Sequence, residues 1–126
     1  MKEVLGAFSI FVVIITLSVI SSVYTNNIAE KLTDLTHSCE KDVQEEKWAD
    51  ANLKIKQARE CFSENSHALE SFLLHDDIER LSDILTSIEI AVELQDESQS
   101  VSNIKIFTRR LHELAESDKL TLNNIL

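Results

Sequence analysis

The sequence contains no proline and only one glycine, Gly6, which lies within an apolar stretch near the amino terminus. Proline and glycine supply many of the tight turns and boundaries that punctuate sheet proteins. Their scarcity therefore predicts long helices joined by short polar turns. It also argues against a glycine-rich phosphate-binding loop anywhere after Gly6.

Positive charge is also scarce. The chain has 12 lysine and arginine residues against 22 acidic ones, a net charge of −10. Lys2 and Glu3 cancel, so this whole excess belongs to the residues beyond the apolar stretch. A surface of that sign repels phosphate backbones, and no basic stripe offsets it, which argues against nucleic-acid binding. Removing the first 24 of 126 residues leaves 102, the size of one domain.

A long uncharged run occupies the amino-terminal part of the sequence. Val4–Tyr24 supplies 21 mostly apolar residues, and a helix rising about 1.5 Å per residue would cross a hydrocarbon core of about 30 Å. A cleaved signal peptide is the competing interpretation, but its apolar region usually spans only about 7–15 residues. We therefore predict a retained single-pass anchor over residues 1–25, in contact with the membrane through residues 4–24, and an acidic helical domain over residues 26–126.

The charges that flank the run suggest an orientation in the cell membrane. Lys2 and the α-amino group precede the run, whereas Glu30 and Lys31 cancel just after it. Since positive charge is retained on the cytoplasmic side, the domain is expected to be extracytoplasmic.

Four stretches of the domain carry apolar residues at helical spacing. The first helix is expected to continue from the anchor, and the second to begin at Trp48 and to be weakest at residues 63–66. The stripes comprise Ile28, Leu32, Leu35, Cys39 and Val43; then Ala51, Ile55, Ala58, Phe62, Leu69, Phe72 and Leu73; then Ile78, Leu81, Leu85, Ile88 and Val92; and finally Val101, Ile104, Phe107 or Thr108, Leu111 and Leu114. Short connections between such helices predict an all-α fold, with a transmembrane helix followed by an antiparallel four-helix bundle.

Acidic residues mark two helix boundaries. Asp76 and Asp96 each have the pattern of an amino-terminal cap, so the second helix is expected to end near His75. The final segment, Leu120–Leu126, is apolar but too short and irregular for a fifth helix. It is expected to dock either into a groove of the bundle or onto a partner, because leaving it in water would forgo stability.

Few residues suggest chemistry. His75, Asp76, Asp77 and Glu79 form the densest group of potential metal ligands, yet helix capping and the helix dipole account for these residue types without a metal. They remain weak candidates, and no metal or other cofactor is predicted. Arg109, Arg110, His112, Glu113 and Glu116 fit a solvated helix face. No nucleophile motif is recognisable, so we do not expect an enzyme.

The two cysteines, Cys39 and Cys61, each fall beside apolar residues and fit small buried side chains. A hairpin turn near Glu45 would place them about ten residues apart along antiparallel helices, which is about 15 Å. A disulfide requires a Cα separation of only about 4.4–6.8 Å. No bond between them is therefore expected.

Three segments carry a family resemblance: Trp48, residues Phe72–Asp77, and the ending Leu120–Leu126. In their order and spacing the chain resembles the DUF4363 family, single-span proteins of Gram-positive bacteria with no established activity, and the similarity covers the whole chain. Where the family often has a second tryptophan, this sequence has Phe62. Family genes tend to accompany those of YetF-like multi-span proteins, so the resemblance implies a multi-span membrane partner.

These observations lead to two functional hypotheses. The leading one is a non-enzymatic accessory or interaction protein that serves a membrane-embedded partner. The alternative is an extracytoplasmic sensory or small-ligand-binding module. A buried pocket lined by His67 or His75 would favour the ligand-binding module, whereas a filled core with an exposed apolar patch would favour the interaction protein.

Overall fold

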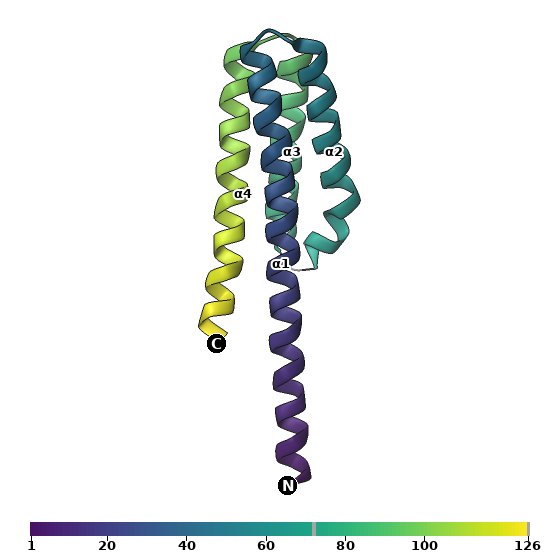
Figure 1. The fold of residues 1–126 in the computed structure, drawn as a ribbon, viewed down its shortest axis with the longest axis vertical. Coiled ribbons are helices and arrows are strands. Elements are labelled where there is room, and N and C mark those ends of the chain that lie inside the picture. Colours follow the sequence, from purple (N-terminus) through teal and green to yellow (C-terminus); the bar gives the residue numbers. More distant parts are fainter. Residues whose placement is uncertain (72, 126) are drawn as a thin grey trace.

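The computed structural model describes the backbone of residues 1–71 and 73–125, and side chains as far as Ser117. The described backbone forms four helices and no strand. They are α1 (Lys2–Gln44), α2 (Trp48–Glu70), α3 (His75–Glu93) and α4 (Glu97–Ile125). Consecutive helices run antiparallel, and α1 packs against both α2 and α4, while α3 completes the ring (Figure 1). The predicted all-α bundle is confirmed.

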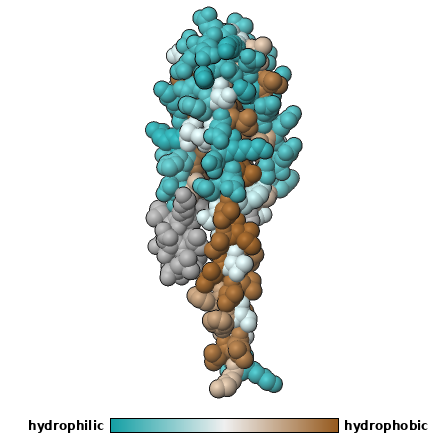
Figure 2. Space-filling view, viewed as in Figure 1, coloured by the Kyte–Doolittle hydropathy of each residue, from teal (hydrophilic) through white to brown (hydrophobic). Residues whose placement is uncertain are grey.

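Helix α1 is about twice as long as α2 or α3 and has two distinct halves. Its amino-terminal half extends below the rest of the bundle as an apolar stem, coloured brown in Figure 2, and its carboxyl-terminal half forms one wall of the bundle. Among the described residues this is the one helix long and apolar enough to cross a membrane. The predicted continuation of the apolar stretch into the first bundle helix is also confirmed.

The core is built from the four predicted stripes. Leu32, Ile55, Leu85, Ile88 and Phe107 are among the side chains with no or almost no solvent exposure. Cys39, Val43 and Ile104 extend the same cluster, and residues at its edge such as Tyr24 and Trp48 are half-buried against it. Because each helix turns one apolar stripe inward, the acidic residues remain on the outer faces.

Two connections at the end of the bundle farthest from the stem adopt the same geometry. Glu46 and Gln95 have φ angles of 60° and 55°, in the left-handed region. Their N–H groups bond to the carbonyls of Val43 and Val92, and the following N–H groups bond five residues back, which is the Schellman arrangement. The tight turns therefore form without the glycine that usually occupies this position.

Two helix boundaries were predicted from acidic caps, and one of them is confirmed while the other is wrong. Asp96 does cap α4, because its Oδ1 accepts a hydrogen bond from the Gln99 N–H at 3.1 Å. However, α2 ends at Glu70 rather than near His75, and α3 begins at His75 with the extended Leu74 at its cap position. Asp76 is therefore inside the first turn, where its charge favours the helix dipole without capping.

The segment from Leu120 onward was expected to be irregular, and this prediction of its backbone conformation was wrong. Residues 120–125 continue α4 as a helix instead of forming an irregular tail. The segment has neither proline nor glycine, and adding residues to an existing helix costs no new nucleation. Its predicted docking lies outside the described residues, because their side chains are not described beyond Ser117.

A polar cluster joins α2 to α3. The guanidinium of Arg59 donates to Glu89 Oε1 at 2.5 Å, to Ser82 Oγ at 2.9 Å and to Thr86 Oγ1 at 2.7 Å. Both charged side chains are partly exposed, so solvent screens their attraction. The several directed hydrogen bonds nevertheless favour one rotation of α2 against α3.

The left-handed connections generate a stability prediction. Glycine adopts this region without the Cβ clash that costs other residues roughly 1–2 kcal/mol, so Glu46→Gly and Gln95→Gly should each stabilise the fold by about 1 kcal/mol. Thermal unfolding of the full chain in detergent, followed by circular dichroism, measures this. Leu94→Gly is the matched control, because its φ of −79° gives glycine no advantage. A lower melting temperature for both Glu46→Gly and Gln95→Gly would contradict the assignment.

Candidate functional site

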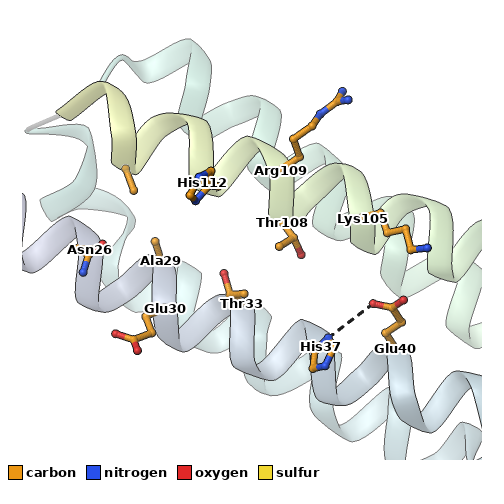
Figure 3. A pocket seen from close by; sticks show the side chains of 11 residues that line it. Asn26, Ala29, Glu30, Thr33, His37, Glu40, Lys105, Thr108, Arg109 and His112 are labelled. Atoms are coloured by element: carbon orange, nitrogen blue, oxygen red, sulfur yellow. Dashed lines mark ion pairs between the residues drawn. The ribbon is translucent and has the colours of Figure 1, made fainter. Parts of the chain in front are cut away.

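An open groove of about 680 Å³ lies between α1 and α4. Figure 3 shows both walls at close range. The lining residues are Asn26, Ala29, Glu30, Thr33, His37 and Glu40 of α1, with Lys105, Thr108, Arg109, His112 and Ala115 of α4. The groove begins just above the apolar stem and runs along the bundle, parallel to its helices.

Helical spacing explains why these residues share a groove. Asn26, Glu30, Thr33, His37 and Glu40 follow one another at intervals of four, three, four and three, which places them along one face of α1. The apolar stripe of α1, from Ile28 to Val43, has a similar spacing, and each of its residues lies two or three positions after one of these polar residues. The regular polar stripe was therefore visible in the sequence, although it was not recognised as part of a site.

The walls differ in charge. Helix α1 contributes Glu30 and Glu40, whereas α4 contributes Lys105 and Arg109. His37 Nδ1 lies 3.9 Å from Glu40 Oε2, and Arg109 Nε lies 3.8 Å from Glu113 Oε1, so the ion pairs described here stay within one helix. In Figure 3 the Arg109 side chain extends away from the groove. Such exposed pairs contribute little to stability and leave these charges free to exchange partners.

The middle of the groove is formed by small and hydrogen-bonding groups. Thr33 and Thr108 project from opposite walls (Figure 3), and the small residues Ala29 and Ala115 also line the groove. His112 projects from α4 on the side that faces α1. Hydroxyl, amide, imidazole and carboxylate groups together suit a small polar molecule or the polar side chains of another protein.

The structure does not bring the four weak candidate metal ligands, His75, Asp76, Asp77 and Glu79, together in one site. His75 and Glu79 line a shallow groove between α2 and α3, with His75 Nδ1 3.3 Å from Glu70 Oε1. Asp77 lines a different hollow between α3 and α4, beside Arg80 and Arg110. Asp76 lines neither. In the described part of the chain, no group of three or more potential ligands is close enough to hold a metal ion.

The interior of the bundle is filled. A void of only about 10 Å³ lies beside Thr25 near the stem end of the core, which is about the space of a single water molecule. The Thr25 hydroxyl is the one buried side-chain polar group in the described residues without a hydrogen-bond partner. His67 is exposed on α2, and the groove that His75 lines is open to solvent. Neither histidine therefore lines a buried pocket.

The two cysteines are free and buried. Cys39 Sγ lies 3.4 Å from the carbonyl oxygen of Ala51, and Ala51 precedes Cys61 by ten residues along α2. That offset corresponds to about 15 Å and confirms the predicted separation. Burial, reinforced by nearby Asp42, raises the pKa of the Cys39 thiol to about 12. Burial also raises the pKa of Cys61.

Fold and groove together define an all-α protein in which one helix forms both an exposed apolar stem and a wall of a filled four-helix bundle. The chain belongs to the family described as Domain of unknown function (DUF4363), whose model matches residues 19–125. No curated protein and no solved structure gives a significant match to the chain.

The buried thiols generate a prediction about reactivity. The thiolate is the attacking species, so raised pKa values and burial should prevent Cys39 and Cys61 from reacting with Ellman's reagent at pH 8 in the folded protein. After denaturation without reductant, both thiols should react at once. Immediate reaction of the native protein, or a disulfide-linked peptide in a non-reducing digest, would contradict the burial and separation described above.

Proposed function

We propose that this protein is a membrane-anchored, non-enzymatic interaction protein whose bundle serves a multi-span membrane partner of the YetF-like kind. The observation that carries the proposal is the continuity of α1 from the exposed apolar stem into the bundle. In water, that stem would expose a row of large apolar side chains such as Phe8, Ile10 and Ile14. Transfer of such groups into lipid is strongly favourable.

The filled interior supports interaction rather than catalysis or enclosure of a ligand. An internal binding site needs several hundred Å³, whereas the void beside Thr25 offers about 10 Å³. The chemically varied surface of the bundle is instead concentrated in the open groove between α1 and α4. A partner in the same membrane would meet this groove, because it starts at the level where α1 leaves the stem.

The bundle is proposed to face the outside of the cell. Lys2 and the α-amino group precede the apolar stretch, whereas Lys31 is the one lysine or arginine among residues 25–40 that follow it. The positive-inside bias then favours a cytoplasmic amino terminus.

A second candidate function is the binding of a small polar ligand. The volume of the α1–α4 groove, about 680 Å³, lies within the usual range for ligand pockets. The groove is open and lies on the surface, so it fits a site that is completed by another protein at least as well as it fits a pocket for a small ligand. The ligand-binding candidate therefore comes second.

The sidedness can be measured with introduced cysteines. Ser98→Cys lies at the end of the bundle farthest from the stem and is exposed, so a membrane-impermeant maleimide should label it in intact cells. Glu3→Cys, which keeps Lys2, is the control and should be labelled only after lysis. The native thiols remain unlabelled because they are buried. Labelling of Ser98→Cys only after lysis would reverse the proposed orientation.

The proposed interaction can be tested by crosslinking in native membranes and purification in detergent. A multi-span protein should be recovered in near-stoichiometric amount with the wild-type chain. Thr33→Arg would fill the groove and should reduce this recovery, whereas Asp83→Arg, on the exposed outer face of α3, should not. Recovery of the chain alone, together with saturable binding of a small molecule that Thr33→Arg abolishes, would favour the second candidate.

A further inference from the structure

The lower part of α1 has an unusual distribution of polarity. From Leu17 to Thr25 the side chains turned toward the other helices are small and polar except for half-buried Tyr24, and Ser21 and Thr25 are buried. The outward face of the same segment is apolar, and Leu17, Ile20 and Val23 remain 60%, 56% and 54% exposed. Here the helix therefore turns its polar groups inward and its apolar groups outward.

Further along α1 the arrangement is reversed. Leu32 and Cys39 are buried against the other helices, whereas Asp34, His37 and Lys41 are exposed. Apolar residues inside and charged residues outside are what water requires. Small polar residues between helices and apolar residues outside are typical of helices that pack within lipid. The reversal between Thr25 and Leu32 thus marks a change of surroundings along the bundle.

The length of the free stem leads to the same conclusion. Between the charged Glu3 and Ser18, the first half-buried polar residue of α1, Val4–Leu17 provides 14 residues, or about 21 Å of helix. A hydrocarbon core is about 30 Å thick. The missing length of about 9 Å corresponds to the next six residues, 18–23, which already belong to the packed part of α1.

Helix α4 approaches the same level with a matching sequence. Ala29 and His112 line one groove, and α4 runs antiparallel to α1, so Lys119 lies seven residues lower, near the level of Ser22. From Leu120 to Ile125 the side chains carry no charge, three being apolar and three polar, and the backbone remains helical. In Figure 1 this end of α4 lies beside the upper part of the stem. Lys119, the last charged residue of α4, therefore lies at about the level of residues 18–23 of α1, which are needed to complete the membrane span.

The connection between α2 and α3 also reaches this level. Leu73 and Thr25 line the same small void, and the next residue, Leu74, is 72% exposed despite its apolar side chain. A large exposed leucine at the membrane-facing end of a bundle is unfavourable in water but favourable in contact with acyl chains.

We propose that the stem end of the bundle is embedded in the lipid bilayer. Lipid covers Leu17, Ile20 and Val23, the end of α4 beyond Lys119, and Leu74. This inference rests on the proposed function, because it requires the stem to span a membrane. The anchor is then more than a single helix below a soluble domain, since the acyl chains of the outer leaflet surround α1 together with the end of α4.

Charged residues limit the depth of this embedding. Glu70 and Asp76 lie close to Leu74 in the sequence, and a carboxylate is costly within the hydrocarbon. The α2–α3 connection is therefore placed at the boundary between headgroups and acyl chains. Only α1 and the uncharged end of α4 continue below it.

Spin labels on single introduced cysteines provide the test, with the full chain reconstituted into vesicles of phosphatidylcholine and phosphatidylglycerol. Collision rates with oxygen, which concentrates in lipid, and with a water-soluble nickel complex are measured for Leu74→Cys and Leu122→Cys. Leu94→Cys is a matched control, because Leu94 is 73% exposed at the opposite end of α3. Ile10→Cys reports on the stem.

The nickel complex should collide several-fold less often with labels at 74 and 122 than with the label at 94, while oxygen collisions increase. If either label is as accessible to nickel as position 94 while Ile10→Cys lies in lipid, the embedding is wrong but the anchor stands. If Ile10→Cys is also accessible to nickel, the anchor itself is wrong. Shielding of position 74 or 122 from both probes would mean that protein covers this end, which also overturns the proposal.

Discussion

The structure depends on the unbroken backbone hydrogen bonding of α1 from the apolar stem into the bundle. A helix satisfies its own backbone groups, so it can pass from an apolar to an aqueous medium without an unpaired N–H or carbonyl in between. A proline or a flexible loop after Tyr24 would have separated a membrane span from an independent domain. With 43 residues and a length of about 65 Å, α1 instead fixes the bundle to the stem direction.

The remaining helices are arranged around this rod by turns that use no glycine. Glu46 and Gln95 accept left-handed backbone angles because the hydrogen bonds of the Schellman arrangement and the packing of the adjoining helix ends outweigh the local cost. Both turns lie at the end farthest from the stem. The connection from α2 to α3 at the opposite end has a different form, with extended Leu74 leading directly into α3.

The sequence predicted those features that depend on a repeated pattern. Apolar spacing identified the four helices and their buried faces, and the uncharged run identified the stem. The sequence did not predict the start of α3, where a single residue decides between two possible helix boundaries. Asp76 has the composition of a cap, but the backbone of Leu74 begins the helix two residues earlier. The groove was missed for another reason: its α1 wall is visible as a polar stripe, but its α4 wall depends on which helices become neighbours, and that requires the fold.

The two walls of the groove differ in how they are attached, and this difference matters for any membrane partner. The α1 wall continues without interruption into the stem, whereas the α4 wall, described as far as Ile125, packs against α1 and α3 along the bundle. A partner that tilts the stem therefore acts directly on one wall of the groove. Because packed helices resist small continuous deformation, that force would be transmitted as a shift of α1 against α4, along the surface where Thr33 and Thr108 project toward each other.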